Sequence, residues 1–551
     1  MKQFKYIILA SSILLWTFTS CSKKIDDAYL NPNADVKKPV EEILPGVIDN
    51  MLCSGSANGN NYGVAQDAMY FGHYIQFWVR NAAQYQYDQM GGVTGGSDLL
   101  GNIWAMHYYG QGQNIVKIVE WASEEQKWDY VGVAHAIRAW AWLTLTDTHG
   151  EVILKDAFNT SQRVFSYETQ KEVYEEVRRL SHVSLNFLNM TGGNVSQANL
   201  AKGDKYMNQG DVNKWKKFVY GVLARSFHRE TNKSFYAVDS VLKYVDLAAT
   251  TNADNTISTF NMESMHNNAF HFWGQRRGNI GASIQSKFIA DLMSGANPTF
   301  EEIEDPRAAY ILQENAEGTY RGFRPTWGQE SLPSTQRPKN FFGGSVASGT
   351  TTTAPGGKED SARYVFRDKP PFPVMTACEM KFIKAEALYR KGGANKAAAL
   401  QAYKEGIELS MNMLKDVYTV NSIWPGRELT AAKISDFVTN SGVVPDLASF
   451  NLSHIMLQKF IALYGYGVVE TWVDLRRFHY TDVESGTTRQ VYDAFEVPIE
   501  SRRFVNNTGK LVYRARPRYN SEYLYNIAAL TAVGAMELNY HTKEMWFSIP
   551  E

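Results

Sequence analysis

Apolar residues recur along much of this chain at the spacing of an α-helix. Ala134, Ile137, Ala141 and Leu145 are three or four residues apart, so they share one face of a predicted helix. Gly150 follows this run, and glycine is a favourable residue just past the end of a helix. The pattern therefore predicts a helix that buries one apolar face and ends near Gly150.

Two further helices are predicted downstream. Thr169 and Glu172 have the spacing of a capping box, in which each side chain accepts a hydrogen bond from the backbone amide of the other residue. The helical period then continues through Val173, Val177, Leu180, Val183 and Phe187. The next helical segment opens at Asn213, and its apolar face is formed by Trp215, Phe218 and Val222.

Residues 377–391 predict another helix, which stops at Gly392 and Gly393, and helical spacing then resumes through Leu409. Two helices joined by so short a turn pack as a hairpin. Small residues at helical spacing would let them approach closely: Ala385, Ala387, Ala398 and Ala402. The spacing resembles a tetratricopeptide repeat; because only this unit is clear, we expect degenerate and scattered repeats.

Two long stretches, around residues 54–112 and 250–360, carry little helical pattern. The first is dense in Gly, Asn, Gln and Tyr, which predicts loops and short helices lining a surface. Long loops in compact domains tend to be functional. We therefore expect residues 21–551 to form a single domain, in which a helical frame carries these insertions and the insertions carry the ligand surface.

The first 20 residues have the pattern of a secretory signal. Lys2 and Lys5 precede an apolar run over residues 6–18, and small residues lead to Cys21. A helix of that length spans about 20 Å, less than the roughly 30 Å of a hydrocarbon core. Residues 18–21 resemble a lipobox, so we expect cleavage after residue 20 and lipid attachment at Cys21; the alternative is ordinary cleavage with an incidental thiol.

Charge and cysteine content exclude several classes of protein. The chain has 56 basic and 57 acidic side chains and a formal net charge of -1, so no overall field would attract nucleic acid. Besides Cys21, only Cys53 and Cys378 are present, and the sequence leaves open whether they pair. We expect no cofactor and no protein-ligated metal, since no spacing of a metal site or phosphate loop occurs, but the sequence leaves open whether a calcium ion steadies the loops.

Several motifs, in order along the chain, resemble the SusD/RagB family of nutrient-binding outer-membrane lipoproteins. Residues 30–33 read Leu-Asn-Pro-Asn, and residues 136–150 resemble the first repeat helix of the family. The most specific match is a Trp-x-Asp-Leu-Arg-Arg signature at residues 472–477. Further landmarks are residues 305–307, the Arg-Pro-Arg-Tyr at residues 516–519, and residues 546–551.

The resemblance implies a mainly α fold with about four irregular tetratricopeptide helix pairs and a loop-rich ligand-binding face. It also implies an outer-membrane location, with the protein anchored by lipid and facing the exterior. The implied partner is a SusC-like TonB-dependent barrel that imports the captured ligand. We interpret the acidic and basic residues of the 472–477 signature as a structural ion-pair network and not as catalytic groups.

Candidate ligand-binding residues combine aromatic rings with polar groups, as sugar recognition requires. A first group in the early loop region comprises Trp78, Arg80, Asn81, Tyr85, Tyr87 and Trp104. A second group in the later loops comprises Trp273, Arg276, Trp327 and Phe341. Each ring has an alternative role in core packing, because several of them have helix-compatible spacing.

The sequence therefore predicts a cell-surface protein that captures oligosaccharide without changing it chemically. Peptide capture is an alternative, since the same Asn and Gln side chains can bind a backbone. The alternative of another class is a glycoside hydrolase, which needs two carboxylates roughly 5 to 10 Å apart. No Asp or Glu lies in a recognisable catalytic motif, so we predict that the protein is not an enzyme.

Overall fold

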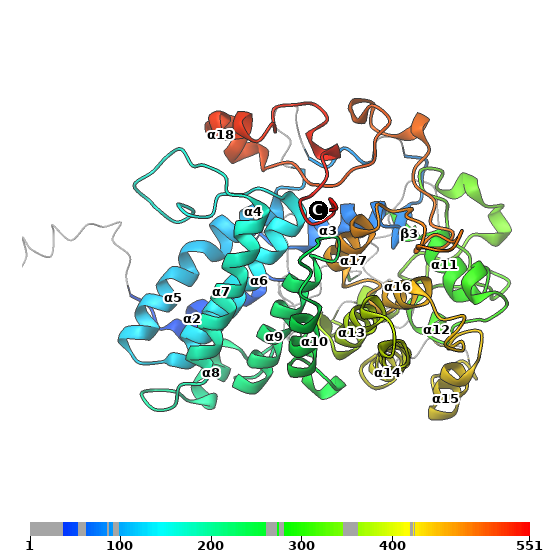
Figure 1. Cartoon of the computed structure of the whole chain (residues 1–551), viewed down its shortest axis with the longest axis horizontal. Coiled ribbons are helices and arrows are strands. Elements are labelled where there is room, and N and C mark those ends of the chain that lie inside the picture. The colour runs from blue at the N-terminus through cyan, green and yellow to red at the C-terminus, as the bar shows by residue number, and fades with distance from the viewer. Residues whose placement is uncertain are drawn as a thin grey trace, which may run out of the picture. The chain divides into compact units, whose positions relative to one another are not determined.

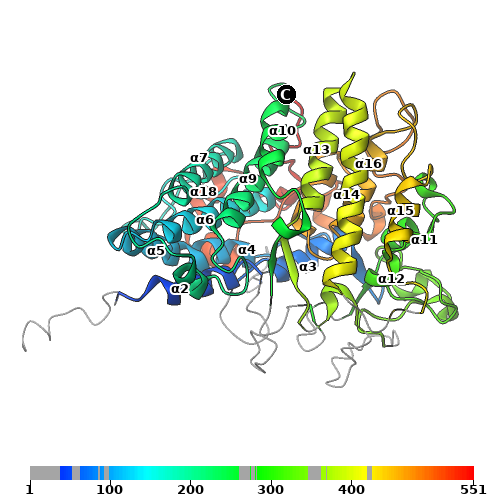
Figure 2. The same cartoon turned by 90° about the horizontal axis from the view of Figure 1, so that it is seen from below.

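Pairs of consecutive helices pack side by side and form the frame of the molecule (Figures 1 and 2). The computed structural model describes residues 37–52, 62–84, 87–91, 99–259, 273–274, 280, 282–344, 362–367, 369–418, 423 and 425–551. Residues 40–551 form one compact unit. The helix pairs are α6 (Trp128–His149) with α7 (Gln170–Leu188), α9 (Val212–His228) with α10 (Val238–Leu247), and α13 (Ala377–Lys391) with α14 (Asn395–Val417).

The helix boundaries follow the capping signals in the sequence. Helix α7 is capped by Thr169, whose side chain accepts a hydrogen bond from the backbone amide of Glu172. The Glu172 side chain accepts one from the backbone amide of Thr169, so the predicted capping box is confirmed. Helix α6 ends at Gly150, which has φ +87°. Helix α13 ends at Gly392, with φ +70°, before α14 begins, so the predicted hairpin is confirmed.

Helix α6 is the central element of the frame. Nearly all of its residues are buried, because α5 (Gly112–Glu124), α7 and α9 pack around it. Helices α2 (Val40–Asp49) and α8 (Gln197–Gly203) pack against each other beside it. The remaining helices are α3 (Ala65–Tyr74), α4 (Asn102–Ala105), α11 (Lys287–Ser294), α12 (Ala308–Ile311), α15 (Ala431–Thr439), α16 (Leu452–Ala462), α17 (Val468–Arg477) and α18 (Ile527–Ala532).

Strands are short and lie in the loop-rich part of the chain. β1 (Trp78–Arg80) pairs antiparallel with β3 (Ser283–Gln285), so that Val79 lies opposite Ile284. β2 (Thr256–Ser258) pairs antiparallel with β4 (Phe372–Met375). Two π-helical turns, η1 (Met106–Gln111) and η10 (Tyr519–Tyr523), accompany several single turns of 3-10 helix. In the part of the chain that the structure describes, the architecture is mainly α.

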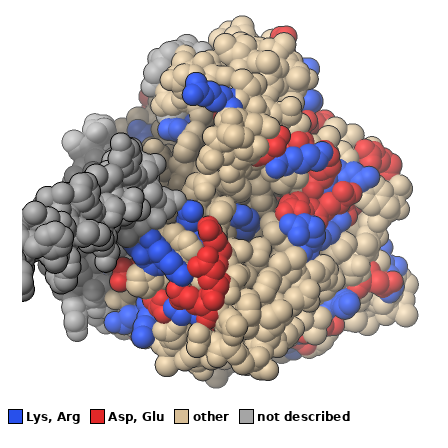
Figure 3. Space-filling model, turned by 90° about the vertical axis from the view of Figure 1, so that its left-hand side faces the viewer, with Lys and Arg blue, Asp and Glu red and all other residues tan. Residues whose placement is uncertain are grey.

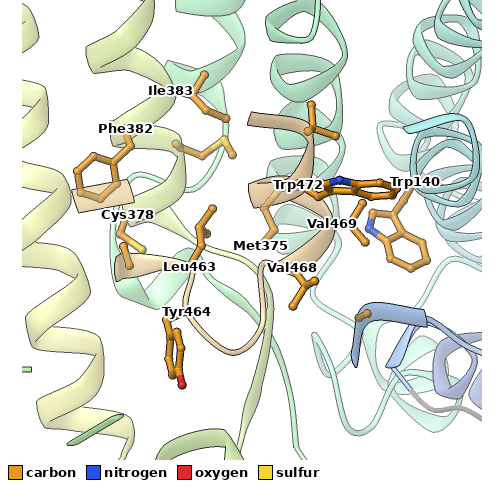
Figure 4. Close-up of a cluster of buried hydrophobic side chains, with 14 of the residues drawn as sticks. Trp140, Met375, Cys378, Phe382, Ile383, Leu463, Tyr464, Val468, Val469 and Trp472 are labelled. Carbon is orange, nitrogen blue, oxygen red and sulfur yellow. The ribbon is translucent and has the colours of Figure 1, made fainter. Parts of the chain in front are cut away.

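The hydrophobic core joins the helix pairs to α3 and α17. Trp472 of α17 stacks on Phe71 of α3, with ring centroids 4.3 Å apart. Figure 4 shows Trp140 of α6, Trp472 and Met375 pointing into one buried region. Cys378 lies in this core as a free thiol. None of the helices among the described residues is long and apolar enough to cross a membrane.

Buried ion pairs cross the core beside these rings. Arg477 pairs with Glu386 and with Asp474, and Lys459 pairs with the other oxygen of Asp474 at 2.7 Å. The guanidinium of Arg476 lies 3.8 Å from the centroid of the Trp472 ring. These groups are almost fully excluded from solvent, so the prediction of a structural ion-pair network at residues 472–477 is confirmed.

Surface charges are arranged differently from the buried ones. Basic and acidic side chains are interspersed on the face of the molecule shown in Figure 3. This mixing agrees with the formal net charge of -1. The visible face therefore shows no extended area of a single sign that would attract a polyanion from a distance.

Candidate functional site

Residues 324–328 form a tight turn that carries Trp327. Arg324 and Gly328 face each other in an isolated antiparallel bridge. Thr326 has φ +68° and Gly328 has φ +57°, both in the left-handed region. Strained backbone of this kind persists where the surrounding structure fixes it. Trp327 is therefore held by a defined loop.

The loop that follows β1 packs against this turn. The backbone amide of Gln84 donates to the carbonyl oxygen of Thr326 at 3.0 Å, and the amide of Gln329 donates to the carbonyl oxygen of Asn81 at 2.8 Å. These residues lie far apart in the sequence, so the contacts exist only in the folded chain. They place Arg80 and Asn81 of the first candidate group beside Trp327 of the second.

Trp327 is half-buried and is supported from behind by an arginine. The guanidinium carbon of Arg502 lies 3.8 Å from the centroid of the indole ring, within cation–π distance. Arg502 also donates to the carbonyl oxygen of Thr326 at 2.7 Å, which fixes it under the turn. The exposed Arg324 lies 5.9 Å from the centroid of the same ring and pairs with Glu496 at 2.9 Å. The ring thus has a rigid support and an accessible edge.

A hollow of about 250 Å³ opens beside Trp327. It is lined by Lys287, Asp291, Arg321, Gly322, Arg324, Trp327, Ser331 and Leu332. Lys287 and Asp291 form an ion pair one turn apart on α11. Burial raises the pKa of Asp291, whereas Lys287 and Arg321 act to lower it. One aromatic ring among charged and hydroxyl groups is the composition that binds sugars.

Two smaller hollows also border the 324–328 turn. One is lined by Arg80, Gln84, Tyr87, Pro325 and Thr326 among others. The other is lined by Trp327, Glu496 and the 497–499 segment among others. Arg80 is exposed, whereas the hydroxyl of Tyr87 is buried and burial raises its pKa well above 10. The structure thus brings Arg80 and Trp327 together on one surface, which we call the Trp327 surface, and Tyr87 lines it with its hydroxyl buried. Asn81 of the first candidate group is instead buried, at 6% exposed, and contributes its backbone carbonyl oxygen to the turn.

Four other aromatic candidates lie in the core. Trp78 is fully buried and its indole N–H donates to the carbonyl oxygen of Met69 at 2.8 Å. Trp104, Trp273 and Phe341 are each at most 2% exposed. Phe341 stacks on Phe366 with ring centroids 4.0 Å apart. Because neighbouring side chains cover these rings, they are packing residues in this structure.

The remaining predicted positions lie outside the described residues. Tyr85 and Arg276 belong to the two candidate groups, and Cys21 is the predicted lipid attachment site. Cys53, one of the two cysteines whose pairing was left open, also lies outside them. Their roles stay predictions.

Several groups of the Trp327 surface were not among the sequence candidates: Lys287, Asp291, Arg321, Arg324, Ser331, Glu496 and Arg502. One signal could have found the arginines, because residues 320–339 contain four basic side chains and one acidic side chain. Nothing in the sequence would have linked Arg502 or Glu496 to Trp327, since that contact depends on the tertiary fold.

The lining of the 250 Å³ hollow bears on the alternative of a glycoside hydrolase. Asp291 is the one carboxylate among its lining residues, and it pairs with Lys287. A glycosidase needs a second carboxylate facing the first across the scissile bond. Among the described residues, no group of three or more His, Cys, Asp or Glu side chains is arranged to hold a metal ion.

The sequence matches a family model, SusD-like, described as "Starch-binding associating with outer membrane", over residues 37–501. The match covers most of the chain, and the chain belongs to this family. The resemblance to the SusD/RagB family found in the sequence is therefore confirmed.

Solved structures of the same fold span nearly the whole chain. A SusD/RagB family protein from Bacteroides thetaiotaomicron is 19% identical, with a TM-score of 0.66, over 94% of this chain and 100% of that one. A SusD homolog from Bacteroides fragilis is 16% identical, with a TM-score of 0.67, over 93% and 100%. A chitin-binding SusD homolog from Flavobacterium johnsoniae is 15% identical, with a TM-score of 0.64, over 93% and 99%. No curated protein matches the chain. At these identities the similarity shows the fold alone.

Proposed function

We propose that this protein captures an oligosaccharide at the cell surface and does not alter it chemically. The observation that carries the proposal is the half-exposed Trp327 ring, fixed by Arg502 at 3.8 Å and bordering a hollow with polar walls. An indole supported on one side offers its apolar surface to a sugar ring, while the surrounding groups bind hydroxyls. Family membership and the chitin-binding SusD homolog of the same fold support it.

The proposal includes attachment and delivery. Lipid on Cys21 would hold the protein on the outer membrane, and a SusC-like TonB-dependent barrel would import the captured ligand. The description of the family as associating with the outer membrane supports this location. The near-neutral charge of the chain leaves hydrophobic contact as the main attraction to such a partner.

One surface has the composition of a protein interface, and we propose that it contacts the barrel. It consists of the exposed side chains of Leu524, Tyr525, Ile527, Met536 and Leu538, around α18 at the edge of the molecule in Figure 1. Residues 519–540 contain no Lys or Arg. Interface centres are depleted of charge and enriched in aromatic residues and Met, and exposed apolar patches mark interaction sites.

Ligand binding is tested by calorimetric titration of the chain without residues 1–21 against neutral and acidic glycans and mixed oligopeptides. This truncation leaves the compact unit of residues 40–551 untouched. We expect saturable glycan binding that is lost in Trp327→Ala and retained in Trp128→Ala. Trp128 is also half-buried, and it stacks on Phe187, at the start of α6. Binding of peptides alone, or glycan binding unaffected by Trp327→Ala, would contradict the proposal.

The partner is tested by isolating the lipidated protein from outer membranes with mild detergent. We expect a TonB-dependent barrel to co-purify with the wild type and to be lost when Tyr525 and Leu538 are both replaced by Asp. Val505→Asp is the matched control, since Val505 is an exposed apolar residue outside that surface. Isolation of the wild type without a barrel would refute the proposed partner, and retention by the double variant would refute the proposed contact surface.

A further inference from the structure

Positive charge is concentrated around Trp327. Between residues 320 and 339 the chain has four basic side chains, Arg321, Arg324, Arg337 and Lys339, and a single acidic one, Glu330. Over the whole chain the two signs balance to a formal net charge of -1. The excess is therefore a local feature of the segment that carries the ring and lines the hollow.

Two guanidinium groups of the Trp327 surface have no carboxylate within ion-pairing distance among the described residues. Arg321 is exposed and lines the 250 Å³ hollow together with Trp327. Arg80 is exposed and lines the neighbouring hollow, which shares Thr326 with the turn. Each presents several N–H donors to solvent, although Asp291 is close enough to Arg321 for the two charges to interact.

The other cations of the hollow are paired, yet accessible. Lys287 pairs with Asp291, and the Lys287 side chain is 50% exposed. Arg324 pairs with Glu496, and these two side chains are 44% and 49% exposed. Exposed pairs of this kind contribute little to stability, so a ligand group can replace the carboxylate at small cost. The lining of the large hollow carries three cations, Lys287, Arg321 and Arg324, against the one carboxylate of Asp291.

A neutral sugar gives no reason for this excess. Sugar hydroxyl groups need hydrogen-bond donors and acceptors in similar numbers. Asn, Gln, Ser and backbone groups supply both, and binding to them does not require a charged side chain to lose its water. A guanidinium is suited to planar or tetrahedral oxyanions, because its parallel N–H groups bind two oxygens at once. The walls of the hollow therefore match a ligand that carries negative groups along a sugar backbone.

We propose that the Trp327 surface selects oligosaccharides that bear anionic groups, either carboxylate or sulfate. A sugar ring packs against Trp327, and an anionic substituent on the same or the next residue binds Arg321, with Arg80 available to a further one. This inference rests on the proposed capture of oligosaccharide and specifies the ligand class of the same site.

The test compares each acidic glycan with a neutral counterpart of the same backbone. Oligosaccharides of a polyuronate are titrated beside their carboxyl-reduced form, and a sulfated glycan beside its desulfated form. We expect each acidic form to bind at least about tenfold more tightly, because a charge-assisted hydrogen bond to a guanidinium is stronger than one between neutral groups. We also expect affinity for the acidic form to fall as salt is raised from about 0.05 to 0.5 M, because exposed charges are screened. The polyuronate comparison tests recognition of carboxylate, and the sulfated-glycan comparison tests recognition of sulfate.

Arg321→Gln is the diagnostic variant. We expect it to weaken binding of the acidic form about tenfold and binding of the neutral form much less, so that the preference for the acidic form shrinks. The melting temperature should stay the same, because Arg321 is exposed. Arg163→Gln is the matched control: it removes one exposed positive charge elsewhere on the molecule and should change neither affinity.

The failures of the two proposals are distinguishable. Equal binding of acidic and neutral forms, still lost in Trp327→Ala, would overturn the anionic ligand class and leave oligosaccharide capture standing. Absence of binding to every glycan would overturn both. Binding of acidic oligopeptides in place of glycans would also overturn both, because the charges would then serve a different class of ligand.

Discussion

Arg477 of α17 binds Glu386 of α13 through two hydrogen bonds, one to each carboxylate oxygen, at 2.7 and 2.8 Å. Both side chains are completely buried. Burial acts to raise the pKa of Glu386, but Arg477, His228 and Arg390 together outweigh it and hold that pKa well below its usual value. This contact joins the family signature to the helix hairpin across 91 positions of sequence.

Replacing Arg477 by Met should therefore destabilise the protein substantially. The change keeps a long apolar side chain but leaves the buried Glu386 and Asp474 carboxylates without their shared partner. We expect the free energy of unfolding to fall by about 3 kcal/mol or more. Denaturant titration measures it. Lys391→Ala is the control, since Lys391 pairs with Asp239 at the surface and should contribute less than about 1 kcal/mol. Equal stability of Arg477→Met and the wild type would contradict the prediction.

Acid should weaken the fold in the range where buried histidines would gain protons. Burial lowers the pKa of six histidines to about 3 or 4: His73, His135, His149, His228, His454 and His541. In the unfolded chain they titrate near 6.5, so the unfolded state binds more protons below that pH. The free energy of unfolding should therefore fall as pH is lowered from about 6.5 toward 4. Asp204, whose pKa burial raises to about 6, opposes this trend in part.

The measurement is chemical denaturation at pH 7.5, 6 and 5. Each histidine that stays neutral in the fold contributes up to about 1.4 kcal/mol per pH unit to the slope. His149→Gln should reduce the slope, because Gln does not titrate. Constant stability from pH 7.5 to 5 would show that these side chains are protonated in the folded protein.

Replacement by Ala should cost much more stability at Trp78 than at Trp327. Trp78 is completely buried and its indole N–H is hydrogen-bonded, so its loss leaves a large cavity and should cost about 3–5 kcal/mol. Trp327 is half-buried at a surface turn, and its loss should cost about 1 kcal/mol. Thermal unfolding of both variants checks this. Similar losses of stability would mean that Trp327 is a structural residue rather than a ligand platform.

Gly328→Ala should disturb the Trp327 surface specifically. A Cβ atom at this position would lie 2.5 Å from the carbonyl carbon of Ala82, so the 324–328 turn and the loop after β1 must separate. We expect weaker ligand binding with a modest loss of stability. Gly318→Ala is the control: Gly318 also has positive φ (+75°), but a Cβ there would meet no atom within 4 Å. Calorimetry of both variants separates the steric effect from backbone strain, and unchanged binding in Gly328→Ala would contradict the prediction.

The helices were predictable because their signals are local. The apolar period over residues 134–145, the capping box of Thr169 and Glu172, and the break at Gly392 each lie within a few residues of the structure they specify. Helix propensity and capping act over a single turn, so a linear pattern contains that information. The family signature likewise predicted its own structural role, since alternating charges beside a helix usually form ion pairs.

The sequence could not show which side chains from distant parts of the chain come into contact. Trp78 and Trp327 look equally plausible as ligand platforms in the sequence, yet β3 and neighbouring rings bury the first, whereas the turn at Thr326 and Gly328 exposes the second. Arg502 reaches Trp327 only because distant segments fold together. The sequence by itself determined the helices, the family and the set of available side chains. The tertiary structure decided which of them face solvent, because burial depends on what the rest of the chain places over each ring.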